Sequence, residues 1–213
     1  MGANLAGMRS ARGMRVTELA RATGVTPSLI SQIERGQSRP SVATLFSLAE
    51  ALGVAVDALF DRGAAARHYS QGFLASQGGS LGAVSTDSDG SGSRYVVRAD
   101  GREAIDIEGG VRWERLTPDT LPYAEFLELV YAPGAQSNAN AYRHPGTEMV
   151  LMLSGQIVID VGFESFELGP GDSIQFPSSM PHRYCNNTDE TARAVTVILH
   201  DYDTSGSSSD TSL

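Results

Sequence analysis

Apolar residues in the first sixty positions recur at the spacing of amphipathic helices, and turn residues interrupt them at intervals. Positions 16, 19, 20 and 23 share one helical face, and Gly24 follows as a residue that ends helices readily because it tolerates positive φ. A second helix is predicted over residues 26–35, with the Thr26 hydroxyl as its N-terminal cap and Pro27 at its first helical position. Two helices joined by so short a turn form a helix-turn-helix unit.

Two more helices complete the predicted bundle. One covers residues 42–52 and ends at Gly53, and the other is a short fifth helix over residues 56–60. The apolar residues that we expect in the core of these helices are Leu29, Ile30, Ile33, Val42, Leu45, Leu48, Ala49, Leu52, Val56, Leu59 and Phe60.

The pattern changes twice after the bundle. Residues 63–93 are rich in Gly, Ser, Ala and Asp and are predicted to be a flexible linker, in which Phe73, Leu74 and Leu81 are candidates for docking on a neighbour. Short strands are then predicted over residues 95–98, 111–116, 125–131, 148–153, 156–161, 173–176 and 194–199, as in a sandwich or barrel. We therefore expect a two-domain α+β protein: 1–62 helical, 63–93 linker, 94–201 strand-rich, and 202–213 a disordered tail.

The second helix of the helix-turn-helix unit has the chemistry of a DNA reader. Its outward positions carry Ser28, Ser31 and Gln32, and glutamine can pair bidentately with adenine in the major groove. Candidate DNA contacts over the whole bundle are Arg15, Thr26, Ser28, Ser31, Gln32 and Arg39, with the two arginines directed at phosphates. From spacing alone, an ordinary helical bundle with a solvated polar face is an equally good interpretation.

The residues themselves favour the reader. The segments Thr23-Gly-Val-Thr26, Ile30-Ser-Gln-Ile-Glu-Arg-Gly36, Arg39-Pro-Ser41 and Leu48-Ala-Glu-Ala-Leu-Gly-Val54 resemble the XRE-type helix-turn-helix regulators, over about residues 4–60. This resemblance implies a five-helix domain of the λ-repressor type that works as a dimer on a partly palindromic operator.

Three residues of the strand-rich region are candidate metal ligands. His144 and Glu148 stand in His144-Pro-Gly-Thr-Glu148, at the start of an apolar strand in which positions 148, 150 and 152 share a face, and His182 follows later. Two imidazoles and one carboxylate with open positions suit zinc, iron, manganese or nickel. The alternative is that the two histidines are unrelated polar residues near loops.

The spacing of these residues resembles both cupin signatures. Gly134, Tyr142, His144, Glu148 and Gly155 match the first, and Gly171, Pro177, His182 and Asn186 match the second, over about residues 95–200. The resemblance implies a double-stranded β-barrel of jelly-roll type. It departs from the family at Tyr142, where the family has its first histidine, at the loop before it, which is two residues longer, and at Ser179, where the family has glycine.

The missing histidine leaves two forms of the site open: a barrel with a divalent metal, and a metal-free barrel whose His and Glu line an effector pocket. Tyr142 is either a weak fourth ligand or a hydrogen-bond donor to the effector. The predicted effector pocket comprises Tyr142, Val150, Met152, Phe176 and Tyr184, and further candidates are Trp113, Tyr123, Arg143 and Gln175. Cys185 is predicted to be a packed thiol, and His68 and His200 to be surface residues without partners.

Composition narrows the function classes. A single cysteine excludes a disulfide framework and a cysteine zinc finger. The formal net charge is −9, but it is unevenly distributed. Residues 1–60 hold six arginines and four acidic residues, a net charge of +2, so the rest of the chain carries −11. The chain shows no signal peptide and no apolar run near the roughly 20 residues of a membrane span, so we expect a cytoplasmic protein without a membrane partner.

The order of helix-turn-helix, linker and cupin resembles the bacterial XRE-cupin transcriptional regulators. The resemblance implies a homodimer that binds an operator in double-stranded DNA under control of a small-molecule effector in the barrel, and no enzyme activity. The alternative is a mononuclear non-haem iron enzyme resembling hydroxypropylphosphonate epoxidase, whose helical domain supplies a lysine to the substrate. All sixteen basic residues here are arginine, which argues against that enzyme.

Overall fold

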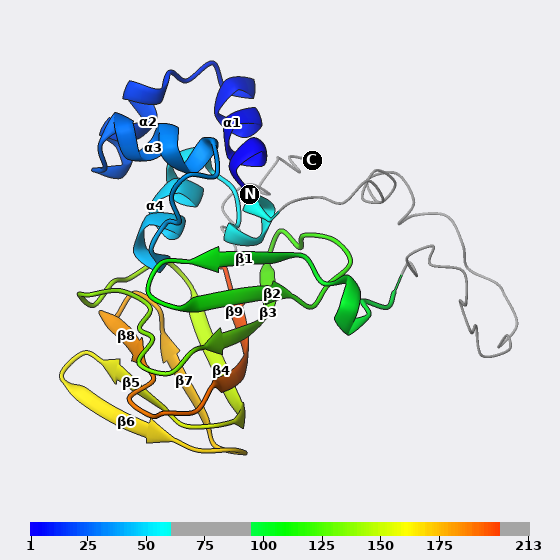
Figure 1. Cartoon of the computed structure of the whole chain (residues 1–213), viewed down its shortest axis with the longest axis vertical. Helices are drawn as coiled ribbons and strands as arrows, with labels where there is room; N and C mark the ends of the chain where they lie inside the picture. Colours follow the sequence, from blue (N-terminus) through cyan, green and yellow to red (C-terminus); the bar gives the residue numbers. More distant parts are fainter. Residues whose placement is uncertain (61–94, 201–213) are drawn as a thin grey trace, which may run out of the picture.

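The computed structural model describes residues 1–60 and 95–200, which form a helical domain and a β-barrel (Figure 1). The predicted linker at 63–93 and tail at 202–213, together with Phe73, Leu74, Leu81 and His68, lie outside the described residues. None of the helices in the described part of the chain is long and apolar enough to cross a bilayer.

The helical domain follows the predicted order. Its elements are α1 (Gly2–Ala11), α2 (Val16–Thr23), α3 (Pro27–Glu34), α4 (Val42–Leu52) and the 3₁₀ helix η1 (Val56–Leu59) in the fifth position. Gly24 ends α2 at φ 71°, and the Thr26 hydroxyl accepts a hydrogen bond of 3.2 Å from the Leu29 amide, so both local signals are confirmed. Ser41 caps α4 in the same way, accepting from the Thr44 amide at 3.2 Å.

The barrel consists of two antiparallel sheets. The larger has the order β1-β2-β3-β9-β4-β7 and the smaller β6-β5-β8. Alternate residues of each inner strand point between the sheets, and on β4 these are Glu148, Val150 and Met152, as predicted from their parity. The strands are β1 (Ala104–Ile107), β2 (Val111–Arg115), β3 (Ala124–Tyr131), β4 (Thr147–Ser154), β5 (Ile157–Val161), β6 (Glu164–Leu168), β7 (Ser173–Pro177), β8 (His182–Cys185) and β9 (Ala192–Leu199).

The structure corrects the strand prediction at four places. Residues 95–98 are not a strand, because Tyr95 and Val96 are largely exposed and a 3₁₀ helix, η3 (Ala99–Gly101), follows directly. Strands β1, β6 and β8 have no counterpart among the predicted ranges. Strands β1 and β8 have only four residues each, and the first four residues of β6 are exposed, so none of them produces a clear alternation of apolar and polar positions.

Gly146, in the turn between His144 and Glu148, is a point of close backbone approach. Its φ is +110°, and a Cβ there would lie 2.2 Å from the carbonyl oxygen of Leu199. We expect Gly146→Ala to lower the free energy of unfolding of the barrel by about 2–5 kcal/mol, from strain and overpacking together. Denaturant unfolding followed by near-UV circular dichroism measures it.

The matched control is Gly134→Ala. Gly134 also has a positive φ of +71°, but a Cβ there would meet nothing within 4 Å. Only the conformational term of about 1–2 kcal/mol should remain. An equal loss of unfolding free energy in the two variants would show that the close contact between Gly146 and the Leu199 carbonyl does not constrain this turn.

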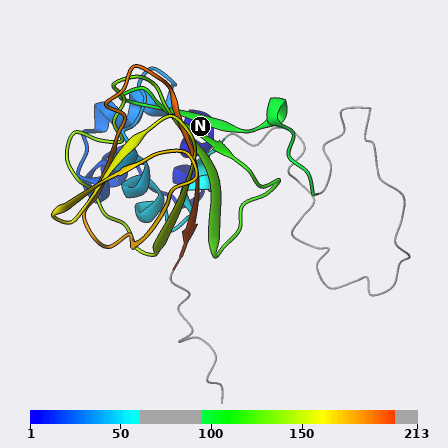
Figure 2. The same ribbon diagram turned by 90° about the horizontal axis from the view of Figure 1, so that it is seen from below.

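The helical domain docks on one end of the barrel, with α4 nearest to it (Figures 1 and 2). Hydrogen bonds between described residues join the domains: the Glu108 amide donates to the Pro40 carbonyl at 2.9 Å, and the Val42 amide to the Ser137 carbonyl at 3.3 Å. The third runs from the Val56 amide to the buried Glu125 carboxylate at 2.9 Å. Because hydrogen bonds are directional, these three bonds favour the orientation of the two domains that the structure shows.

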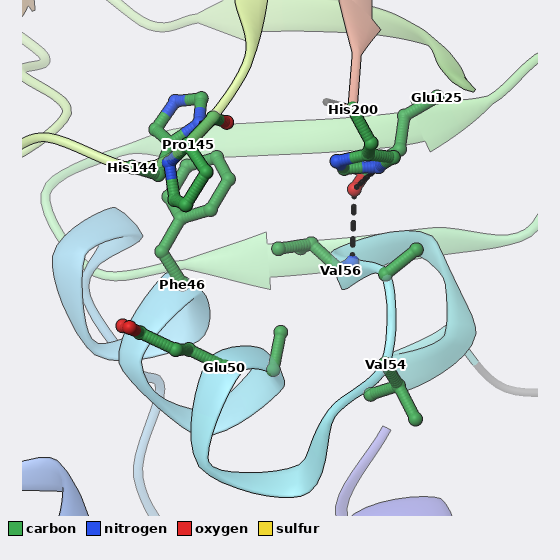
Figure 3. Close-up of a pocket in the computed structure, with 10 residues that line it drawn as sticks. Phe46, Glu50, Val54, Val56, Glu125, His144, Pro145 and His200 are labelled. Carbon is green, nitrogen blue, oxygen red and sulfur yellow. Dashed lines mark hydrogen bonds and ion pairs between the residues drawn. The ribbon is translucent and has the colours of Figure 1, made fainter. Parts of the chain in front are cut away.

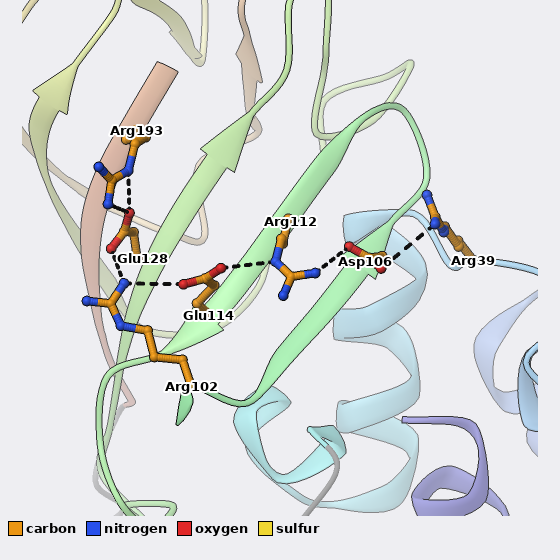
Figure 4. A network of polar contacts seen from close by, with 7 residues as sticks. All are labelled: Arg39, Arg102, Asp106, Arg112, Glu114, Glu128 and Arg193. Atoms are coloured by element: carbon orange, nitrogen blue, oxygen red, sulfur yellow. Dashed lines mark hydrogen bonds and ion pairs between the residues drawn. The ribbon is translucent and has the colours of Figure 1, made fainter. Parts of the chain in front are cut away.

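A row of alternating charges continues from this contact along the large sheet (Figure 4). It begins where Arg39 of the helical domain lies 3.8 Å from Asp106 of β1. The members, in order, are Arg39, Asp106, Arg112, Glu114, Arg102, Glu128 and Arg193. Because Arg39 and Asp106 are both substantially exposed, this first ion pair contributes at most about 1 kcal/mol, and the hydrogen bonds above carry more of the docking.

Candidate metal and ligand site

Three chain segments bring His144, Glu148 and His182 together between the sheets. His144 lies in the loop before β4, Glu148 is the second residue of β4, and His182 begins β8. The loop is held to β8 by a reciprocal pair of backbone hydrogen bonds between Tyr142 and His182, of 3.0 and 2.8 Å. All three candidate ligands are buried, at 7%, 4% and 0% exposure.

The free atoms of these side chains converge. His144 Nε2 lies 3.5 Å from Glu148 Oε2, and His182 Nε2 lies 3.6 Å from the same oxygen. These three atoms have no hydrogen-bond partner among the described residues. Buried polar atoms are rarely left in this state, and three of them facing one another fit a divalent cation that accepts a lone pair from each.

Backbone carbonyls orient both imidazoles for this role. His144 Nδ1 lies 3.2 Å from the Pro145 carbonyl, and His182 Nδ1 lies 2.8 Å from the Met180 carbonyl. A carbonyl only accepts, so each Nδ1 carries the proton. The lone pair therefore stays on Nε2, the atom that faces Glu148.

The two oxygens of the Glu148 carboxylate have different surroundings. The Tyr184 hydroxyl donates a hydrogen bond of 2.6 Å to Oε1, and this leaves Oε2 directed at the histidines. Burial alone would raise the pKa of Glu148. In the pH range where this carboxyl group titrates, protonated His144 and His182 and the Tyr184 hydroxyl outweigh burial and hold this pKa below its usual value. The side chain is thus an anion at neutral pH, as a metal ligand must be.

His182 is the neutral partner of this anion. Burial lowers the pKa of its imidazole, and the attraction of Glu148 offsets only part of that effect. A neutral imidazole presents a lone pair to a cation at neutral pH without first losing a proton.

Tyr142 lies against the cluster. It is buried, its ring lies edge-on to His182 with centroids 4.5 Å apart, and burial raises the pKa of its hydroxyl well above the usual value. Without a metal the phenol is therefore neutral and can donate a hydrogen bond. Both roles given for Tyr142, fourth ligand and hydrogen-bond donor, stay predictions.

The other predicted pocket residues fall into two groups. Val150, Met152, Phe176 and Tyr184 are buried between the sheets around the cluster, and so is Trp113. Tyr123, Arg143 and Gln175 are exposed. Cys185 is buried, as expected of a packed thiol.

The prediction for His200 was wrong. Its Nε2 lies 3.0 Å from Glu125 Oε1 and its side chain is 26% exposed, so it is a half-buried partner of a buried carboxylate. Nothing in the local sequence indicates this pair, because 75 positions separate the two residues and a strand pairing brings them together.

One residue in contact with the cluster was missed altogether. Phe46 of α4 stacks on the ring of His144, with centroids 3.7 Å apart and planes 7° apart. The available signal was the width of the apolar face of α4: positions 42, 45, 46, 48, 49 and 52 span roughly 160° of the helix, more than one bundle needs to cover. Figure 3 shows the ring rising from α4 toward His144 and Pro145.

The predicted reader residues lie on the helix-turn-helix unit. Thr26, Ser28 and Gln32 are exposed and Ser31 is half-buried, all at or within α3. Arg15 is exposed at the start of α2, where it pairs with Glu18 at 3.0 Å. Arg39 is exposed and faces Asp106 of the barrel. Contact of any of them with DNA stays a prediction.

Two family models match the chain in the expected order. A helix-turn-helix model matches residues 6–59 and a cupin domain model matches residues 127–198. The N-terminal match spans α2 to α4, and the C-terminal match spans the loop and strands that hold His144, Glu148 and His182.

Full-length relatives share both parts. The chain is 26% identical to the HTH-type transcriptional regulator SutR of Escherichia coli over 192 residues, which is 90% of this chain and 89% of that protein. It is 21% identical to the HTH-type transcriptional regulator PuuR of Escherichia coli, over 92% of each chain. A crystal structure of a helix-turn-helix transcriptional regulator from Vibrio cholerae has the same fold, with a TM-score of 0.61 at 22% identity over 94% of this chain and 95% of that one.

Proposed function

Because the chain is an XRE-type helix-turn-helix protein with a C-terminal cupin domain, we propose that it is a DNA-binding transcriptional regulator whose operator affinity a ligand of the barrel controls. The observation that carries this proposal is the pairing, in one chain, of an exposed reader face on α3 with a buried, convergent His144, Glu148 and His182 cluster. We place its action in the cytoplasm, where its DNA partner would be.

We also propose a divalent metal as part of the ligand site. His144, Glu148 and His182 would hold it, and a bound metal would supply an electrophilic centre for a small oxygen-bearing or nitrogen-bearing effector. The orphaned Nε2 and Oε2 atoms support this assignment. Zinc, iron, manganese and nickel all suit the donor set, and Zn²⁺ is the simplest first probe.

The test of the regulator is selection from genomic DNA. The purified full-length protein is incubated with fragments of the genome that encodes it, at moderate salt, and the retained fragments are sequenced. We expect enrichment of one short site with two-fold symmetry. Failure to retain any fragment at low salt, with and without added Zn²⁺, would overturn the regulator.

The alternative enzyme is less well supported. The relatives that span both domains are regulators, and the chain lacks the lysine that the epoxidase family uses. Oxygen consumption that depends on Fe²⁺ and on a small phosphonate or carboxylate would revive it.

We propose that the regulator acts as a homodimer, as a two-fold operator requires. The outer face of the large sheet supports a second copy as the partner, because Leu151, Leu153 and Phe126 are 44%, 42% and 38% exposed on it. Strand β9 lies between the strands that carry them, so these side chains share one surface with Val195 and Val197.

This dimer is testable by sedimentation. We expect Leu151→Glu to convert the dimer to a monomer at micromolar concentration, because a charge would be buried without a partner. The control is Phe163→Glu, at a fully exposed position on the turn between β5 and β6. An unchanged sedimentation coefficient for Leu151→Glu would show that this face of the sheet is not the dimer interface.

Tyr184 is expected to support the metal without touching it. Tyr184→Phe removes the hydrogen bond to Glu148 Oε1 and keeps the packing of the ring. Loss of such an outer partner typically weakens metal binding about 10–100-fold, and chelator competition with Zn²⁺ measures it. Tyr123→Phe, at an exposed tyrosine, is the control and should bind as the unmodified protein does. Equal affinities for both variants would contradict the role of Tyr184.

A further inference from the structure

The wall of the ligand site includes a residue of the DNA-binding domain. Phe46 of α4 is 9% exposed, and its ring is surrounded by aromatic side chains of the barrel. It stacks on His144 at 3.7 Å, meets Trp113 edge-on at 5.9 Å and lies 5.9 Å from Tyr142. Removing α4 would therefore uncover one face of a candidate metal ligand.

The stack adds to the constraints that the barrel places on His144. The hydrogen bond from Nδ1 to the Pro145 carbonyl is long, at 3.2 Å, and the rings of Tyr142 and His182 lie farther away, with centroids at 6.3 and 5.2 Å. A parallel aromatic face at 3.7 Å fixes the plane of the imidazole, and with it the direction of the Nε2 lone pair.

A cavity opens beside this stack. It has a volume of about 150 Å³ and lies between α4 with the segment after it and the rim of the barrel (Figure 3). The helical domain contributes Phe46, Ala49, Glu50, Val54, Ala55 and Val56, and the barrel contributes Glu125, His144, Pro145 and His200. A small molecule bound there would touch both domains at once.

We infer that Phe46 is a positioning residue for His144, and that through this stack occupancy of the His144, Glu148 and His182 site is coupled directly to docking of the DNA-binding domain. The inference rests on the proposed function, since it assigns the route by which that site regulates DNA binding. The signal passes within one chain across the α4 contact. It needs neither the linker nor a second subunit.

The physical basis is linkage. A metal binds best when His144 holds its lone pair toward Glu148, and the docked α4 favours that orientation. Binding of the metal must therefore favour docking by the same factor as docking favours the metal. Undocking would also free Arg39 from Asp106 and change the position of α3 relative to the barrel.

The chain contains its own reporter of docking. Trp113 is the sole tryptophan, it is 3% exposed, and Phe46 packs against its ring. Its fluorescence should shift to longer wavelength when α4 leaves. Zn²⁺ is a suitable probe because it binds the proposed ligand set and has no unpaired electrons to quench the emission.

The experiment compares full-length Phe46→Ala with the unmodified protein. We expect Phe46→Ala to weaken Zn²⁺ binding about 5- to 150-fold and to shift Trp113 emission to longer wavelength. Chelation of Zn²⁺ should shift the emission of the unmodified protein in the same direction. The control is Phe163→Ala, a fully exposed phenylalanine, which should change neither quantity.

A second variant separates the stack from general loss of packing. Phe46→Leu keeps an apolar side chain in the interface but has no flat ring, so Trp113 should stay buried while Zn²⁺ binding still weakens. Unmodified Zn²⁺ affinity in both Phe46 variants would overturn the coupling and leave the proposed function intact. Failure of the unmodified protein to bind Zn²⁺ would instead overturn the metal site itself, and the coupling with it.

Discussion

Replacing Glu148 with glutamine is expected to reduce Zn²⁺ affinity at least about 100-fold. Substitution of residues that only hydrogen-bond to a metal ligand already reduces metal affinity about 10–100-fold, and Glu148 is a proposed ligand itself. The substitution keeps the shape of the side chain and an oxygen that can accept from the Tyr184 hydroxyl. It removes the negative charge that faces two imidazoles in a buried site, where attraction to a divalent cation is weakly screened.

Chelator competition and calorimetry measure this effect. The control is Glu164→Gln, an exposed carboxylate at the start of β6, which should bind Zn²⁺ as the unmodified protein does. A retained affinity in Glu148→Gln would mean that the metal binds elsewhere. Circular dichroism of the variant without metal shows whether the barrel is intact.

Replacing Gln32 with alanine is expected to abolish discrimination at one base pair of each half-site. Gln32 is exposed on α3, the helix that would enter the major groove. A bidentate glutamine–adenine pair contributes about 1–3 kcal/mol of discrimination, so the preference for adenine over the other bases should fall about 5- to 150-fold for each half-site. Competition binding with single-base variants of the selected operator measures it.

The matched control for this prediction is Gln156→Ala, at an exposed glutamine between β4 and β5 of the barrel. It should leave the base preference unchanged. Loss of affinity for every sequence equally in Gln32→Ala, with the base preference retained, would show that Gln32 contacts the phosphate backbone and does not read a base.

Local chemistry made the helical domain predictable. Gly24 stops α2 because it takes positive φ, and Thr26 starts α3 because its hydroxyl satisfies a free amide. Each effect acts within about one helical turn, so the residues that cause it stand next to the boundary that they set. The parity of Glu148, Val150 and Met152 is equally local, since alternate residues of a strand point to one face.

Weak periodicity explains the errors in the barrel. Strand β6 exposes four of its five residues, and β1 is only four residues long, so neither has a clear apolar pattern. Each is a strand because it pairs with a neighbour: β6 with β5, and β1 with β2. Residues 95–97 are Tyr, Val and Val, yet they form no strand. An edge element depends on its neighbour more than on its own sequence.

The sequence by itself determined which residues are candidates for the chemistry: Gln32 on a capped helix, and His144, Glu148 and His182 at the spacing of two motifs. Only the tertiary structure decided how they are supported. The Tyr184 hydroxyl meets Glu148 across two sheets, and Phe46 meets His144 across two domains. Such contacts join residues 36 and 98 positions apart, where no cap or periodicity acts, so they depend on how complete elements dock.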